Sequence, residues 1–134
     1  MQFVALIYID PAMVEELPDG KYDSEMRRCL DHADELRRAG RLTQSLMLED
    51  PPTAKSIRVR KGHQTVMDGP FTETKELLAG FNLIEAADID EAVQIAAEFP
   101  WAQTGCVEVR PVRDIDAVRR RVGSSQSATL HGVG

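Results

Sequence analysis

The chain has 134 residues and a formal net charge of −6, with 22 acidic and 16 basic residues interleaved along it. This length predicts one domain that buries about two thirds of its unfolded surface and needs no disulfide or metal to fold. The acidic balance argues against a nucleic-acid-binding face. The sequence has no basic leader, and no apolar run approaches the roughly 20 residues of a membrane span. We therefore expect a cytoplasmic protein with no membrane segment.

The first predicted elements are a strand and a helix. Residues Phe3 to Ile9 form an unbroken apolar run, which is typical of a central strand covered on both faces. Residues 10–22 predict a connecting loop with one helical turn. The next segment predicts an amphipathic helix from Ser24 to Ala39, with Asp23 or Ser24 as N-cap and Gly40 as the stop. Its apolar stripe consists of Met26, Cys29, Leu30, Ala33 and Leu36.

A second strand and a hairpin follow. Residues Arg41 to Glu49 alternate with a period of two, which predicts a strand with Leu42, Leu46 and Leu48 on one face. Residues 57–67 predict a hairpin, because two strand-like runs flank the turn-forming Lys61-Gly62-His63.

The last third of the domain repeats the alternation of strand and helix. Residues 73–79 predict a helical turn capped by Thr72, and residues 81–85 resume the sheet. Asp88 and Glu91 have the spacing of a capping box, and the apolar stripe after them predicts a second helix that Pro100 stops. Residues 106–111 predict a closing strand, residues 113–122 a short helix, and residues 123–134 a disordered tail.

This order of elements favours an α+β fold. It suits a ferredoxin-like split β-α-β sheet with an inserted hairpin and both helices on one face. The domain is expected to span residues 1–112, with the short helix and the tail in residues 113–134. One layer of helices cannot bury the second apolar face of a sheet, so we expect a homodimer that packs sheet against sheet.

Known cofactor and metal motifs are missing from the sequence. Cys29 and Cys106 are far apart, and neither has a second Cys or a His at zinc-ligand spacing. We therefore expect two reduced core thiols and no metal site. The sequence also lacks a glycine-rich phosphate loop, a paired-histidine motif and a nucleophile elbow, so no cofactor is expected.

One stretch combines many polar side chains with a rigid bend. In Asp68-Gly69-Pro70-Phe71-Thr72-Glu73-Thr74-Lys75-Glu76, Gly69 tolerates positive φ and Pro70 fixes φ, so the Asp68 carboxylate is held where a strand ends. Such a bend either aims a side chain into a cleft or is simply a turn, because Asp-Gly is among the commonest turn signals.

This run resembles the signature of the DGPF (DGPFAETKE) family within the YCII-related proteins, and differs from it only by Thr72 in place of Ala. The resemblance continues through 80–81, 83–85, 88–92 and 105–111, and so covers nearly the whole domain. It implies a bacterial chain that assembles as a dimeric α+β barrel. Most members of that family have no established activity, so the resemblance names no substrate.

The signature supplies most of the candidate site residues. Asp68 is the candidate catalytic residue, because a partly desolvated carboxylate acts as an acid or base near neutral pH. The alternative is a carboxylate that accepts backbone N–H groups within its own turn. Lys75, with Glu73 and Glu76, could bind an anionic group or form a solvated ion pair. Thr72 is a further ligand-binding candidate or a cap.

Two candidates lie on strands outside the signature. The Tyr8 hydroxyl could reach a cavity, although an aromatic on a central strand is also typical of a core. Arg110 could bind an acidic ligand or pair with Glu108. The resemblance to better-studied YCII-like proteins implies a His-Asp pair for hydrolytic or dehalogenating chemistry. None of His32, His63 and His131 is evidently delivered beside Asp68, so this chemistry is not carried over.

The sequence leaves three functions open. The first is an enzyme or enzyme-like protein with a small-molecule pocket between the sheet and the dimer partner. The second is a non-catalytic binding or regulatory module, because family members often resemble companions of alternative sigma factors, which implies a stress or regulatory context. The third is a purely architectural signature that fixes the hairpin and the dimer register.

Overall fold

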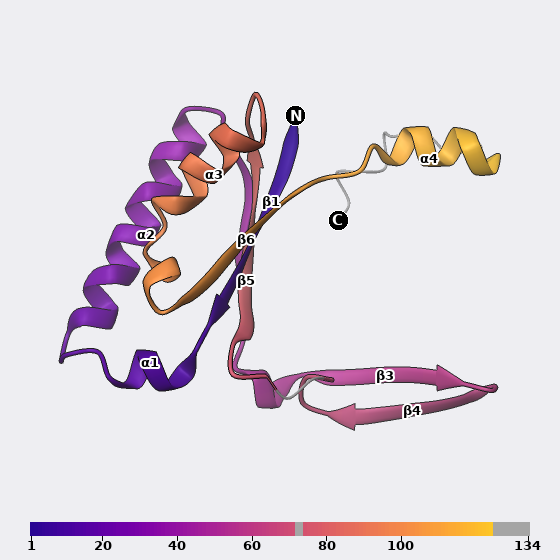
Figure 1. Ribbon diagram of the computed structural model, residues 1–134, viewed down its shortest axis with the longest axis horizontal. Helices are drawn as coiled ribbons and strands as arrows, with labels where there is room; N and C mark the ends of the chain where they lie inside the picture. The colour runs from indigo at the N-terminus through magenta and orange to yellow at the C-terminus, as the bar shows by residue number, and fades with distance from the viewer. Residues whose placement is uncertain (72–73, 125–134) are drawn as a thin grey trace.

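The computed structural model describes residues 1–71 and 74–124. Its main sheet has four antiparallel strands in the order β2-β5-β1-β6, namely β1 (Gln2–Ile9), β2 (Leu42–Met47), β5 (Leu77–Glu85) and β6 (Gly105–Pro111). Helices α2 (Lys21–Arg38) and α3 (Ile89–Ala97) lie together on one side of this sheet (Figure 1). The predicted α+β fold is confirmed, including the inserted hairpin of β3 (Lys55–Arg60) and β4 (His63–Asp68).

The hydrophobic core lies between the sheet and the two helices. Phe3, Ala5 and Ile7 of β1 face the helices and are buried, whereas the alternate set, Val4, Leu6 and Tyr8, faces the other side of the sheet and is half-buried. Ile84 of β5 and Phe99, which follows α3, complete the centre of the core. The sheet therefore has one face that the helices cover, which carries Phe3, Ala5 and Ile7, and one face that they do not cover.

Helix α2 begins earlier than its sequence predicted. Its N-cap is Gly20 with a φ of 78°, so the prediction of Asp23 or Ser24 as N-cap is wrong. The backbone N–H of Lys21 donates to the Pro18 carbonyl, a turn that starts the helix three residues sooner. Gly40, with a φ of 74°, follows the last helical turn as predicted.

Two side chains predicted to be core are exposed. Leu30 of α2 is exposed, and His32 takes its place in the half-buried stripe, with its Nε2 3.2 Å from the Ile95 carbonyl of α3. Cys106 is exposed too, because it lies on the sheet face away from the helices, opposite Tyr8. The prediction of two core thiols therefore holds for Cys29 alone, which packs against the core.

The helical turn predicted for residues 73–79 is wrong in its described part. Leu77 and Leu78 already belong to β5 and pair with Ile9 and Tyr8 of β1. The Thr74 hydroxyl donates to the Glu76 carbonyl. Sheet pairing thus takes the backbone groups that a helix would have used. Thr72, Glu73 and the tail from residue 125 onward, which includes His131, lie outside the described residues.

We expect the stability that Glu25 provides to depend on pH. Its carboxylate lies 2.9 Å from Lys21 Nζ and 3.1 Å from Arg28 Nη1, and the hydrogen bond with Lys21, assisted by the charge of Arg28, lowers the pKa of Glu25 below 4.5. A lowered folded-state pKa stabilises the protein above the unfolded-state pKa, and the effect disappears as pH falls through the lowered value. Glu25→Gln should therefore lower the free energy of unfolding at pH 7.

Urea unfolding at pH 7 and at pH 3 measures the free energy of unfolding of the wild type and of Glu25→Gln. The difference between the wild type and Glu25→Gln should shrink at pH 3, whereas Glu35→Gln, at an exposed position of the same helix, should change little at either pH. If Glu25→Gln lowered the free energy of unfolding equally at both pH values, the stability would not come from the ionised Glu25 carboxylate.

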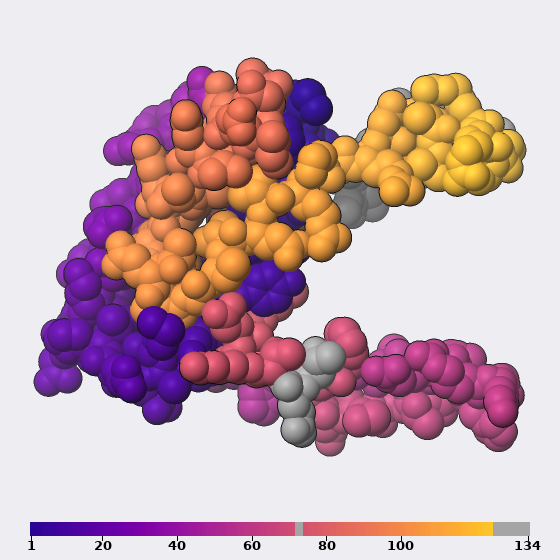
Figure 2. Space-filling model, in the orientation of Figure 1, coloured from indigo at the N-terminus to yellow at the C-terminus, as the bar shows by residue number. Residues whose placement is uncertain are grey.

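Two parts of the chain project from the other side of the sheet. The hairpin of β3 and β4 and the helix α4 (Ile115–Val122) extend on the side opposite α2 and α3 (Figure 1). Figure 2 shows open space between these two projections. They flank the uncovered side of the sheet, here called the open face, which carries Val4, Leu6, Tyr8, Leu46, Phe81 and Leu83.

The place of Leu46 on the open face follows from one irregularity in β2. The strand register shifts between Leu42 and Gln44, so Leu42 is buried under the helices while Leu46 stands on the opposite face, 51% exposed. The prediction that Leu42 and Leu46 share a face is therefore wrong. A bulge of this kind inserts an extra residue and reverses the in-and-out phase of the strand beyond it.

Candidate functional site

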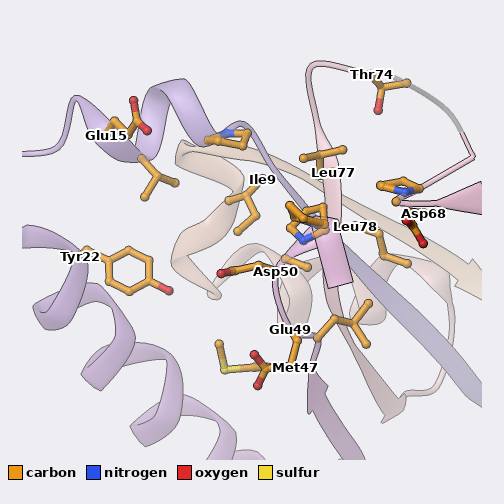
Figure 3. A pocket seen from close by; sticks show the side chains of 18 residues that line it. Ile9, Glu15, Tyr22, Met47, Glu49, Asp50, Asp68, Thr74, Leu77 and Leu78 are labelled. Carbon is orange, nitrogen blue, oxygen red and sulfur yellow. The ribbon is translucent and has the colours of Figure 1, made fainter. Parts of the chain in front are cut away.

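A pocket of about 1290 Å³ lies at the base of the hairpin and is here called the basal pocket. The short helix α1 (Pro11–Glu15) forms one wall, and residues 47–52, from the end of β2 onward, form another. The signature turn, Asp68 to Pro70, and the start of β5 close the remaining side. In Figure 3, Glu15 and Tyr22 lie across the pocket from Asp68 and Thr74.

The signature turn is a fixed wall of this pocket. Gly69 has a φ of 87°, its N–H donates to the Ala54 carbonyl at 2.7 Å, and its own carbonyl accepts from the Ser56 hydroxyl at 2.7 Å. Positive φ favours glycine at this position. The turn is therefore locked to the first strand of the hairpin, and the bend predicted from Gly69 and Pro70 is present.

The Asp68 carboxylate stands at the rim of the pocket. It accepts a hydrogen bond from Lys55 Nζ at the other strand of the hairpin, and its side chain is 81% exposed. No backbone N–H among the described residues donates to it. Asp68 is thus available to a ligand, but water screens it strongly, so it lacks the desolvated environment that the catalytic hypothesis assumes.

The pocket lining combines apolar surface with acidic side chains. Its carboxylates come from Glu15, Glu49, Asp50 and Asp68, and its remaining described lining contains no Lys, Arg or His. Like charges focused in one cleft create a negative potential. The pocket therefore favours a neutral or cationic ligand over an anionic one.

Tyr22 is a lining residue that the sequence reasoning missed. It lies in the first turn of α2, its ring packs against Trp101 with 5.7 Å between centroids, and its hydroxyl is directed toward Asp50 in Figure 3. The early start of α2 at Lys21 brings Tyr22 to the pocket. The sequence signal was the Asp19-Gly20 turn immediately before it.

Lys75 is not among the residues that line the basal pocket. Its Nζ lies 3.6 Å from the Asp10 carboxylate and its side chain is 82% exposed, whereas Asp10 is 3% exposed. Asp10 also caps α1, because its Oδ1 accepts from the Ala12 N–H at 3.0 Å. The pair thus fastens the segment after the signature turn to the end of β1.

The structure does not bring the remaining candidates to Asp68. Tyr8 and Arg110 lie on the open face of the sheet, and Arg110 pairs with Glu108 at 2.7 Å. Glu76 is exposed just before β5, and Thr72 and Glu73 are not described. Of the signature residues, Asp68, Gly69, Pro70 and Thr74 line the pocket.

The described histidines stand apart from the pocket. His32 lies between α2 and α3, with its Nδ1 3.5 Å from Glu98 and its ring edge against Phe99. His63 is the first residue of β4, at the far end of the hairpin from Asp68. Neither forms a His-Asp pair with Asp68, and over residues 1–71 and 74–124 no cluster of three or more His, Cys, Asp or Glu side chains could hold a metal ion. No described helix is long and apolar enough to cross a membrane.

A smaller space, here called the inner cavity, adjoins the pocket on the side of the core. It measures about 50 Å³ and shares Ile9, Tyr22, Met47 and Ala79 with the basal pocket. Cys29 lines it, and burial raises the pKa of this thiol, against the opposing effect of the hydrogen bond that Trp101 Nε1 donates at 3.3 Å. A raised pKa keeps the thiol protonated and weakly nucleophilic.

Comparison with known proteins gives a family and two similar chains. The YCII-related domain family matches residues 1–116. An uncharacterised protein of Rhizobium meliloti (strain 1021) is 35% identical over 114 residues, which cover 84% of this chain and 92% of that protein. The structure of 5-chloro-2-hydroxyhydroquinone dehydrochlorinase from Burkholderia phenoliruptrix AC1100, in complex with 2,5-dihydroxybenzoquinone, aligns with a TM-score of 0.44 and 14% identity, covering 84% of this chain and 94% of that one.

Proposed function

This chain belongs to the family of YCII-related domains, and we propose that it binds a small molecule in the basal pocket beside the DGPF segment. The observation that carries the proposal is that the signature turn, locked to β3 by Gly69 and Ser56, forms a wall of a pocket of about 1290 Å³. A largely preformed cleft with an apolar lining and a few polar groups is the usual form of a small-molecule site.

The lining chemistry indicates the class of ligand. Leu48, Leu77 and Leu78 supply apolar contacts, while Glu15 and Asp50 supply hydrogen-bond acceptors. A ligand with an apolar body and a neutral or cationic polar group suits this arrangement. We propose Asp68 as a contact for such a group rather than as a proton donor, because its side chain is 81% exposed and paired with Lys55.

A bulky side chain on α1 is expected to block binding. Val14 lines the pocket, and Met13, its neighbour on the same helix, is outside the lining and 43% exposed. Val14→Trp places an indole ring inside the pocket and should weaken binding at least about tenfold, the effect of losing roughly 1.4 kcal/mol of contacts. Met13→Trp is the matched control and should leave affinity unchanged. Ligand-observed NMR with a library of neutral and cationic fragments measures both variants.

Two outcomes of the fragment screen would contradict the proposal. If the fragments that bind the wild type bind Val14→Trp equally well, the basal pocket is not the binding site. If no fragment binds the wild type, small-molecule binding is rejected.

We also propose that the chain forms a homodimer through the open face of the sheet. The support is an apolar surface on one side of three adjacent strands, β2, β5 and β1, with Leu46 51% exposed and Val4, Leu6, Phe81 and Leu83 half-buried. An isologous dimer covers such a face with a second copy of itself. The same arrangement would place Tyr8 and Arg110 at the interface.

The hairpin gives independent support for a covering partner. Every residue of β4 is exposed, and Ile57, Val59 and Val66 share one face of the hairpin at 54–65% exposure. A two-stranded hairpin is marginally stable by itself in water. Because the hairpin and α4 both project beside the open face, a partner seated there would cover their apolar side chains (Figure 2).

A further inference from the structure

The inner cavity contains a buried amide that the fold does not use. Asn82 lies on β5, faces the helices and is 5% exposed. Among the side-chain hydrogen bonds of the described residues, none includes its carboxamide. Among the described residues, the fully buried side-chain polar atoms that lack a hydrogen-bond partner are Thr104 Oγ1 and Arg119 Nε. The Asn82 carboxamide is not among them, so it is not completely enclosed, and Asn82 lines the inner cavity.

Small neighbours create the space beside Asn82. Its register partners are Ala5 on β1 and Ser45 on β2, and Gly80 precedes it by two residues on the same face. Ser45 and Gly80 line the cavity with Asn82, so the Ser45 hydroxyl is a second polar group in the cavity beside the amide. A cavity of about 50 Å³ has room for a few waters, or for a ligand end of roughly three or four non-hydrogen atoms.

The groups in the cavity select an uncharged partner. A carboxamide offers one acceptor oxygen and two N–H donors, and a serine hydroxyl both donates and accepts. No charged side chain is among the described residues that line the inner cavity, so an ion placed there would be buried without a partner. A buried amide that lacks its hydrogen bonds is unfavourable, and a bound polar group or water relieves this.

We infer that Asn82 is the specificity-determining residue of the site and takes the neutral polar end, an alcohol or an amide, of a ligand whose apolar body lies in the basal pocket. This inference rests on the proposed function, because the inner cavity and the basal pocket adjoin each other and share the lining residues Ile9, Tyr22, Met47 and Ala79. The acidic lining of the outer pocket accommodates an amine at the ligand's other end.

Two amines that differ only by a hydroxyl test the inference. 6-Amino-1-hexanol and hexylamine share charge and chain, and both are titrated against ¹⁵N-labelled protein by NMR. The wild type should bind the amino alcohol about fivefold more tightly, the range of one net hydrogen bond. Only the amino alcohol should shift the Asn82 side-chain NH₂ signals strongly.

The variants separate recognition from a structural role. Asn82→Leu should lose the preference while being at least as stable to heat as the wild type, because no internal hydrogen bond is lost. Asn82→Ala, which cannot overpack the cavity, should lose the preference too. Equal affinity of the two amines for the wild type, which means the amide binds water only, overturns the inference and leaves the basal pocket intact.

Failure of both amines to bind overturns the inference as well. The proposed function then stands or falls on the separate fragment screen with Val14→Trp. Destabilisation of both Asn82 variants with the hydroxyl preference retained would assign Asn82 a structural role instead.

Discussion

Replacing Leu6 with Glu is expected to prevent the proposed homodimer from forming and to leave a monomer. Leu6 lies in the middle of the central strand β1, on the open face, between Phe81 of β5 and Glu108 of β6. The substitution puts a second carboxylate beside Glu108 at the centre of the proposed interface, and the two-fold symmetry of an isologous dimer repeats it. An unpaired buried charge disfavours association by several kcal/mol.

Sedimentation velocity at micromolar protein concentration measures the change. Leu30→Glu is the matched control: it makes the same substitution on the outer surface of α2, where Leu30 is 52% exposed, and should leave the dimer intact. Alkylation of Cys106 gives a second readout, because this thiol lies on the open face and should be protected in the dimer and accessible in Leu6→Glu. A wild-type monomer, or a dimeric Leu6→Glu, would refute the proposed interface.

The second large effect is expected from Gly105→Ala. Gly105 begins β6 against the end of β1, and a Cβ at this position would overlap the Tyr8 carbonyl oxygen and lie 2.8 Å from Ile9 Cα. Both are backbone atoms of a central strand, so relief requires the two strands to separate. Overpacking of this kind destabilises by up to about 3 kcal/mol. The same strand end carries Asp10 and the wall of the basal pocket.

Urea unfolding at pH 7 compares this variant with Gly40→Ala. Gly40 has a φ of 74°, and a Cβ added there would have no neighbouring atom within 4 Å, so its substitution meets backbone strain alone. The left-handed conformation disfavours an L-residue by roughly 1 to 2 kcal/mol. Gly105→Ala should thus destabilise more than Gly40→Ala. An equal or reversed order would show that β6 can move away from β1 at little cost.

The candidate site combines residues that the sequence singled out with others that it did not. The rigid bend at Gly69 and Pro70 was readable, because positive φ and the fixed φ of proline are local properties. Asn82 could have been noticed, since it interrupts the inward-facing set that contains Ile84 two residues later. The Asp19-Gly20 turn indicated an earlier helix start at Tyr22, but nothing in the local pattern of Tyr22 or Asp50 indicates a shared pocket.

The sequence by itself determined the order of the elements and the kind of fold. The apolar run of β1, the helical stripes of α2 and α3 and the hairpin turn can all be read from local sequence, because the backbone geometry of each element repeats at a fixed number of residues and burial leaves that pattern in the sequence. Asp88 also caps α3 as its position predicted, accepting from the Glu91 N–H at 2.8 Å. These features need no knowledge of distant contacts.

Only the tertiary structure decided which side chains meet. The bulge after Leu42 reverses the faces of β2, and sheet pairing at Leu77 replaces the predicted helical turn. The convergence of α1, β2 and the signature turn then places Glu15, Asp50 and Asp68 around one pocket while directing Lys75 to Asp10. Such contacts join residues far apart in the chain, and their geometry depends on strand register, which a one-residue shift changes completely.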